Sequence, residues 1–167
     1  MFYSDILKEF YNNEIKYLIV GGLSVNLHGI PRVTQDIDII ISLDNKNITG
    51  VTDIMKRLGY VPRLPVNPED IADREKRNSW IKEKNLIAFT FHHTTDHYKV
   101  VDLVISHPLD FDKAYENRIE KNVKDFRINL VSIDDLITMK KHSGRNQDLS
   151  DIKLLEKLQV FMENNNG

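Results

Sequence analysis

Gly21 to Ile41, which reads GGLSVNLHGIPRVTQDIDIII, is the stretch that decides the fold. Its two glycines follow the apolar run of residues 17–20, which predicts a buried strand that ends in a tight turn. A strand that enters two glycines and then a helix leaves backbone N–H groups close to any phosphate placed there. A second apolar strand ends the stretch, and this strand carries two aspartates.

Asp36 and Asp38 are two positions apart in that second strand. Because side chains of a strand alternate between its two faces, both carboxylates are expected on the same face. The neighbouring isoleucines indicate burial, and two buried carboxylates repel each other unless a cation lies between them. Magnesium or manganese fits, since both prefer hard oxygen ligands. Taken alone, an acid-x-acid pair is more often a solvated strand end or a partner of lysines, so the preceding glycines carry much of the argument.

Asp102 is the only acidic residue in a second candidate region, the apolar strand predicted over residues 98–106. An isolated carboxylate in such a strand is a candidate functional residue, because a buried charge is costly unless it is compensated. The alternative is a strand residue that faces water, because Lys99 in the same run is also polar.

These features together resemble the signature of the DNA polymerase beta nucleotidyltransferase superfamily. The resemblance lies in Gly21-Gly22, a gap of 13 residues (23–35) and the acidic pair that follows. Further residues resemble a branch of small bacterial nucleotidyltransferases that includes the toxins of abortive-infection type IV toxin–antitoxin systems. These residues are His28-Gly29, Arg32 and Thr34. The resemblance extends from about residue 17 to residue 158.

The resemblance implies a reaction and a set of site residues. The reaction moves a nucleoside monophosphate group from a nucleoside triphosphate to an acceptor hydroxyl and releases pyrophosphate. Asp36, Asp38 and Asp102 would be the catalytic residues and hold Mg²⁺ or Mn²⁺, and Asp102 would also accept the proton of the hydroxyl. The triphosphate would contact Gly21, Gly22, Ser24, Arg32, Thr34, Lys140 and Arg145.

Lys140 and Arg145 come from a second motif over residues 136–152, which resembles a Lys followed by Arg-x-x-Asp-Leu-x-Asp in the same branch. Asp148 and Asp151 are placed to orient one of these two cations. Each of these assignments has a plainer alternative. The motif also fits a helix–turn–helix junction with capping charges, Arg32 fits an ion pair, and two glycines fit an ordinary strand-to-helix turn.

The spacing of apolar and turn residues predicts an α/β (α+β) fold with a mixed sheet flanked by helices. One domain is expected over residues 1–167, with a catalytic core (1–131) and C-terminal helices (132–163). Strands are expected over residues 16–20, 36–42, 86–92, 98–106 and 126–131. Helices are expected from residue 4 or 5 to 12 and over residues 23–28, 44–58, 68–74, 110–117, 132–144 and 148–162.

Composition narrows the function classes. The chain has 167 residues and no cysteine, which excludes disulfides, thiolate metal sites and a cysteine nucleophile. A net charge of −2 argues against wholesale, non-specific nucleic-acid binding, although a local basic patch is compatible with it. No signal-peptide pattern and no membrane-length apolar run are present, so we expect a cytoplasmic protein without a membrane partner.

The acceptor is left open by the sequence. A toxin-type enzyme would act on tRNA or protein and would have a cognate antitoxin as a partner. An antibiotic nucleotidyltransferase would act on a small molecule of aminoglycoside or lincosamide type. A non-catalytic nucleotide sensor is a third possibility, and the cost of burying three aspartates argues against it. The basic segment around Trp80 is read as a solvated loop and helix with the indole in the core, or as a contact for an acceptor nucleic acid.

Overall fold

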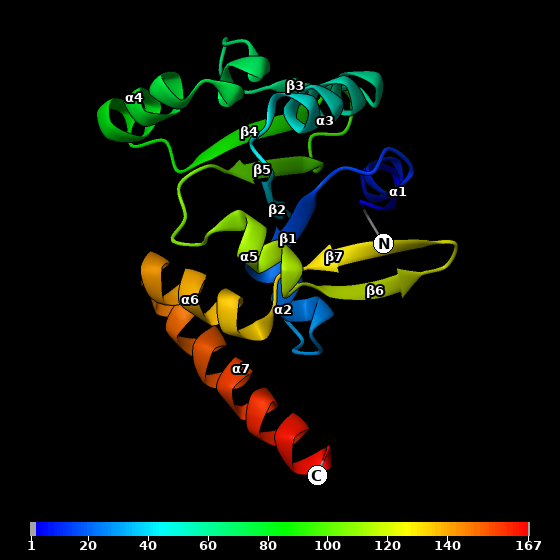
Figure 1. Ribbon diagram of the computed structural model, residues 1–167, viewed down its shortest axis with the longest axis vertical. Coiled ribbons are helices and arrows are strands. Elements are labelled where there is room, and N and C mark those ends of the chain that lie inside the picture. The colour runs from blue at the N-terminus through cyan, green and yellow to red at the C-terminus, as the bar shows by residue number, and fades with distance from the viewer. Residues whose placement is uncertain (1–2, 167) are drawn as a thin grey trace.

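The computed structural model describes residues 3–166 and is shown in Figure 1. The elements in chain order are α1 (Ser4–Asn12), β1 (Tyr17–Val20), α2 (Gly21–Leu27), β2 (Ile37–Ile41), α3 (Asn45–Arg57), β3 (Tyr60–Pro62), the 3₁₀-helix η1 (Pro68–Ala72), α4 (Arg74–Lys84), β4 (Ala88–His93), β5 (Val100–Val104), α5 (Phe111–Glu116), β6 (Ile119–Val123), β7 (Phe126–Leu130), α6 (Ile133–Ser143) and α7 (Asn146–Asn165). Among residues 3–166, no helix is long and apolar enough to cross a membrane.

The strands form one seven-stranded sheet in the order β3-β4-β5-β2-β1-β7-β6. β2 is parallel to β5 and β1 is parallel to β7, while the remaining neighbours are antiparallel. The predicted mixed sheet flanked by helices is therefore confirmed.

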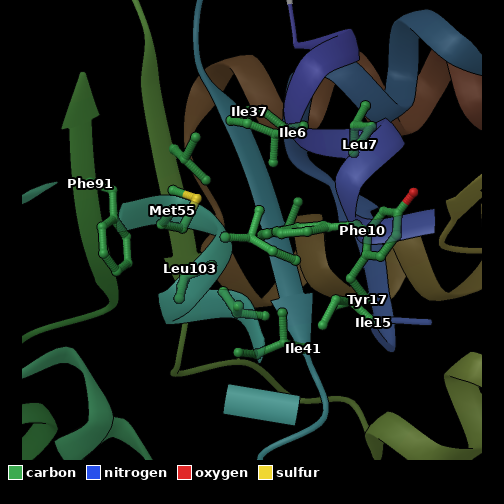
Figure 2. Packing of buried hydrophobic residues seen from close by; sticks show 14 of the residues in the cluster. Ile6, Leu7, Phe10, Ile15, Tyr17, Ile37, Ile41, Met55, Phe91 and Leu103 are labelled. Carbon is green, nitrogen blue, oxygen red and sulfur yellow. The ribbon is translucent and has the colours of Figure 1, made fainter. Parts of the chain in front are cut away.

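The first of two hydrophobic cores covers one face of the sheet. Figure 2 shows Ile6 of α1 beside Ile37 of β2, Phe10 of α1 beside Tyr17 of β1, and Met55 of α3 near Phe91 of β4. Alternation along β2 explains this arrangement, because every second isoleucine points to this face. η1 and α4 close the same core beside β3 and β4 with Ile71 and Trp80.

The second core lies on the opposite face and is smaller. It joins Leu18 of β1 and Ile40 of β2 to residues of α2, α5, α6 and α7. Among residues 3–166, no residue of β3 or β4 belongs to it. The face that carries Ile40 is therefore covered by helices over the middle of the sheet and not over its β4–β3 side.

Side-chain caps confirm several predicted helix ends. Asp44 accepts a hydrogen bond from the N–H of Asn47 at the start of α3, and Ser132 accepts one from Asp135 at the start of α6. Gly144 ends α6 in the left-handed conformation (φ 65°). α1 begins at Ser4 and ends at Asn12 as expected, but no side chain caps its start.

Other boundaries differ from the predictions for physical reasons. α2 begins at Gly21 itself, so the two glycines form the first turn of the helix and do not precede it. The short strands β3 and β6 were missed, because the former has three residues and the latter is a largely exposed edge strand. The bounds of α4 were not predicted, since Trp80 is its only buried residue and no apolar stripe marks it, although Trp80 lies in the core as expected. α7 runs from Asn146 to Asn165 and so extends beyond both ends of the expected 148–162; Gly167 lies outside the described residues.

Candidate active site

Two of the three predicted carboxylates are neighbours in the sheet. Asp38 of β2 pairs directly with Asp102 of β5, and Asp36 lies just before β2. Burial, followed by repulsion from Asp102 and Asp36, raises the pKa of Asp38 to about 6. Burial and repulsion from Asp102 also raise the pKa of Asp36. The carboxylates therefore share a region with an excess of negative charge.

The glycine turn touches this acidic row. Gly21 has a φ of +65°, and a Cβ built on it would lie 2.1 Å from Oδ2 of Asp38. A Cβ on Gly22 would lie 2.9 Å from the Arg32 guanidinium and 3.1 Å from the Thr34 hydroxyl. No side chain larger than hydrogen fits at either glycine unless Asp38, Arg32 or Thr34 moves. The structure thus brings Gly21, Gly22, Arg32 and Thr34 to one place beside Asp38.

The side chain of Ser24 is not exposed at this turn. Its side chain is fully buried, and its hydroxyl has no hydrogen-bond partner among residues 3–166. The hydroxyl is therefore enclosed by protein, and the structure does not support its predicted direct contact with a triphosphate. Any contribution of this turn comes from the backbone of the glycines, at the positively polarised end of α2.

The predicted triphosphate cations form a network with two aspartates of α7. Nζ of Lys140 lies 3.1 Å from Asp148 and 2.7 Å from Asp151. Arg32 contacts Asp151 at 2.7 Å, and Nε of Arg145 contacts Asp148 at 2.8 Å. Burial opposes ionisation of Asp148, but hydrogen bonds from Arg145 and Lys140 outweigh it and hold its pKa well below the usual range.

Accessibility separates Lys140 from Arg145. Lys140 is only 4% exposed and holds two carboxylates, so its ammonium is engaged inside the fold. The Arg145 side chain is 72% exposed, although it also contacts Asp148. Both cations lie near enough to Asp38 to oppose the rise of its pKa. Of the two predicted cations, Arg145 is therefore the one accessible from solution, whereas Lys140 links α6 to α7.

The family model described as a nucleotidyltransferase of unknown function (DUF6036) matches residues 4–160. The chain belongs to this family. The membership agrees with the superfamily resemblance seen in the sequence, whereas the toxin branch is not confirmed. A comparison with curated proteins gives no match.

Solved structures of similar fold include two antibiotic-modifying enzymes. The lincomycin-bound lincosamide antibiotic adenylyltransferase LnuA is 24% identical, with a TM-score of 0.58 and 94% of each chain covered. ANT(2″)-Ia in complex with adenylyl-2″-tobramycin is 12% identical, with a TM-score of 0.57, covering 95% of this chain and 91% of that one. An antigenic nucleotidyltransferase-like protein of Paracoccidioides brasiliensis is 18% identical, with a TM-score of 0.51, covering 92% and 71%. At these identities the likeness supports the fold.

Two residues of this nucleotidyltransferase that the sequence analysis missed support the acidic row. The Thr90 hydroxyl of β4 donates a 2.6 Å hydrogen bond to Oδ1 of Asp102. The Tyr3 hydroxyl lies 2.6 Å from the carbonyl oxygen of Gln35 and 2.9 Å from that of Val100. Tyr3 therefore ties together the beginnings of β2 and β5, the strands that carry the aspartates. A polar residue within the apolar 86–92 run was a visible signal for Thr90, whereas nothing in the sequence pointed to Tyr3.

The donor set fits a divalent cation, although it does not form a closed cage. Among residues 3–166, no three His, Cys, Asp or Glu side chains are grouped closely enough to hold a metal ion as they stand. Asp36, Asp38 and Asp102 nevertheless offer hard carboxylate oxygens. Burial and repulsion between the carboxylates raise the pKa values of Asp36 and Asp38, and a bound Mg²⁺ or Mn²⁺ would neutralise this negative charge. Asp38 and Asp102 are cross-strand neighbours, and Asp36 lies two positions before Asp38 in the chain.

A hollow of about 1130 Å³ lies elsewhere, at the start of β1. Residues of α1, α3 and the β6–β7 hairpin line it, and none of the predicted site residues does. Arg118 and Arg127 in its wall both bond to Glu120. This hollow is therefore separate from the acidic row, which lies at the other end of β1.

Proposed function

We propose that the protein is a metal-dependent nucleotidyltransferase that moves a nucleoside monophosphate group from a nucleoside triphosphate to an acceptor hydroxyl. The observation that carries the proposal is the contact between the glycine turn and a carboxylate row with excess negative charge. Family membership supports the transferase class. A retired, purely structural site has no reason to keep carboxylates whose burial raises their pKa.

Each group of the site has a role in this reaction. Asp36, Asp38 and Asp102 would hold Mg²⁺ or Mn²⁺, which when bound neutralises triphosphate charge and polarises the attacking oxygen. The N–H groups at the Gly21-Gly22 turn and the exposed Arg145 would contact the phosphates.

Asp102 would accept the proton of the acceptor hydroxyl through the oxygen that Thr90 does not occupy. The acceptor oxygen forms a bond to the α-phosphorus as the bond from that phosphorus to the pyrophosphate oxygen breaks.

The acceptor has two candidate classes. A toxin-type reaction on tRNA or protein follows from the sequence resemblance alone. A small-molecule acceptor is favoured by the likeness to LnuA, solved with lincomycin, and to ANT(2″)-Ia, solved with adenylyl-2″-tobramycin. Both classes of acceptor would react at the same carboxylate row. They would differ in the part of the acceptor that lies beyond Asp102.

The test is label transfer from each α-labelled triphosphate, with magnesium, to RNA, protein and small-molecule fractions of a cell extract. The Asp102→Asn variant should transfer roughly 100-fold more slowly or worse, since a general base acts in the transition state. Its triphosphate affinity should fall far less, because Asp36 and Asp38 still hold one cation. Asp112→Asn, an exposed change on α5, is the matched control and should transfer at the wild-type rate.

Two outcomes would contradict the proposal. Wild-type protein that binds triphosphate tightly but labels no fraction would be a nucleotide sensor. Equal transfer by wild type and Asp102→Asn would remove Asp102 from the reaction and place the third carboxylate elsewhere.

A further inference from the structure

The acidic row continues across the sheet to a basic residue. Asp38 of β2 pairs with Asp102 of β5, and Asp102 pairs with Thr90 of β4. The N–H of Arg63, the residue after β3, donates a 2.9 Å hydrogen bond to the carbonyl oxygen of Thr90. Arg63 is therefore the next member of this row, on the side away from the glycine turn.

Strand alternation places these side chains on one face. Phe89 and Phe91 of β4 are buried in the first core, so Thr90 between them points to the opposite face, where its hydroxyl meets Asp102. Tyr60 of β3 is also buried in the first core, and Arg63 is an odd number of positions further on. The two faces thus differ in kind, because one is packed with aromatics and the other carries the polar row.

Arg63 is within electrostatic reach of the carboxylates. Neighbouring strands are about 4.8 Å apart, so Arg63 starts about 10 Å from Asp102, and its long side chain spans much of that distance. The exposed side chain of Arg63 therefore extends toward this carboxylate row from its β3 side.

The charge of Arg63 is not neutralised by a neighbouring carboxylate. On the α6–α7 side of the row, Arg32, Lys140 and Arg145 each pair with Asp148 or Asp151. On the β3 side, Arg63 is exposed and forms no ion pair with any of residues 3–166. An exposed guanidinium beside a reaction centre is suited to bind an anion from solution.

We propose that Arg63 is the anion-binding residue of the acceptor subsite and that the acceptor carries a phosphate close to its reacting hydroxyl. The proposal rests on the function proposed above, which places the triphosphate at the glycine turn and leaves the β3 side to the acceptor. A nucleotide and the 3′ end of a nucleic-acid strand both have this chemistry. A polycationic aminoglycoside does not, because Arg63 would repel it and Thr90 offers it no charge.

The competing explanation is that Arg63 only offsets the charge of Asp36. Substitution with glutamine distinguishes the two, because charge balance acts on triphosphate and metal, whereas acceptor binding acts on the acceptor. Arg63→Gln should raise the KM of a phosphate-bearing acceptor about tenfold or more, the scale of a lost charge-assisted hydrogen bond. The KM of the triphosphate should change by less than about twofold. Arg74→Gln, which removes an exposed arginine of α4, is the control for net charge.

A direct binding assay keeps the inference separate from the proposed function. The probes, without triphosphate, are a fluorescent RNA pentanucleotide with a free 3′ hydroxyl, a nucleoside monophosphate, the corresponding nucleoside and tobramycin. Wild type should bind the RNA or the monophosphate better than the nucleoside and tobramycin, and Arg63→Gln should lose about tenfold of that affinity while Arg74→Gln keeps it. Preference for the RNA over the monophosphate identifies a strand end as the source of the phosphate.

The inference fails if wild type does not prefer a phosphate-bearing probe, or if Arg63→Gln binds it as wild type does. It also fails if Arg63→Gln raises the KM of triphosphate and acceptor equally. A wild-type protein that binds the probe but transfers no label to any acceptor would overturn the proposed function and leave the anion site standing.

Discussion

Two clusters of aspartates in this protein have opposite electrostatic states. In the row on β2 and β5, burial and mutual repulsion raise the pKa of Asp38 to about 6. In the cluster on α7, Asp148 and Asp151 are at least as buried, yet three cations contact them and the pKa of Asp148 is held well below its usual range. Aspartates therefore lack cation partners in the β2–β5 row and are fully paired with cations in the α7 cluster.

The contrast indicates what each cluster does. A buried network in which every carboxylate already has a cation partner gains nothing from a further cation. Such a network instead joins the elements that contribute to it, which here are α6, α7 and the loop after α2 (Figure 1). A row of carboxylates without direct cation partners is stabilised by any divalent ion that enters it. We infer that the α7 cluster is a structural clamp and that the β2–β5 row is the chemical site.

The first prediction breaks the clamp and has the largest expected effect on stability. Lys140→Ala removes the cation shared by Asp148 and Asp151 and leaves buried charge that Arg32 and Arg145 only partly offset. The free energy of unfolding should fall by about 3–5 kcal/mol, the scale of a buried ion pair that loses one partner. Urea denaturation followed by circular dichroism measures it.

The matched control is Lys141→Ala, an exposed change one position away, which should alter the unfolding free energy by less than about 0.5 kcal/mol. Equal losses in the two variants would show that the network around Lys140 is not a clamp.

The second prediction tests the opposite state of the β2–β5 row. Asp38 has a folded pKa of about 6, well above the ordinary aspartate value of 3.8, so the folded state keeps this proton to higher pH than the unfolded state. The contribution of Asp38 to the stability of the wild type should therefore fall as pH rises from about 4 through about 6. Asp38→Asn removes this loss and should be more stable than wild type by about 1–2 kcal/mol at pH 8 in metal-free buffer, with partial exposure reducing the full linkage value.

Melting temperatures at pH 4 and pH 8 measure this difference, and it should vanish at the lower pH. Asp148→Asn is the control of opposite sign, because its low folded pKa contributes stability above pH 4 that the amide loses. Adding Mg²⁺ at pH 8 should stabilise wild type more than Asp38→Asn. If Asp38→Asn is the less stable protein at pH 8 without metal, the row is not short of positive charge.

The sequence predicted the row better than the clamp, for a physical reason. Asp38 and Asp102 stand out because each interrupts an apolar strand, and local alternation fixes the face on which each lies, while Asp36 directly precedes the first of these strands. The glycine turn is also local, since strand, turn and helix follow one another directly. Residue types and short-range periodicity are therefore enough to locate this half of the site.

The pairing state of Lys140 and Arg145 could not be read in the same way. It depends on α7 starting at Asn146, which turns Asp148 and Asp151 toward α6, and on a contact with Arg32 across 119 positions of the chain. Arg63 escaped notice for a similar reason, because β3 is too short to be recognised and only sheet pairing places it in the row. Contacts made by tertiary packing leave no local pattern.

The last prediction concerns Tyr3, which connects the start of the chain to the acidic row. Tyr3 does so through Val100, a residue 97 positions away in the sequence. Its hydroxyl lies within hydrogen-bond distance of the Gln35 and Val100 carbonyl oxygens, immediately before Asp36 and two positions before Asp102. Tyr3→Phe removes this tie while the ring stays buried. We expect a loss of about 1 kcal/mol in stability, the usual contribution of one hydrogen bond, because the single hydroxyl proton donates to one of the two carbonyl groups at a time.

A positioning role predicts a second change that a purely structural role does not. Without this hydrogen bond, β2 and β5 hold Asp36 and Asp102 less firmly, so the affinity for Mn²⁺ should fall about two- to fivefold. Electron paramagnetic resonance at a temperature well below the melting temperature measures this affinity. Tyr11→Phe, on the same helix but 41% exposed, is the control and should leave Mn²⁺ affinity unchanged. A Tyr3→Phe variant that is less stable but binds Mn²⁺ as tightly as wild type would reduce Tyr3 to a packing residue, and the spacing of the carboxylates would then depend on the sheet and Thr90 alone.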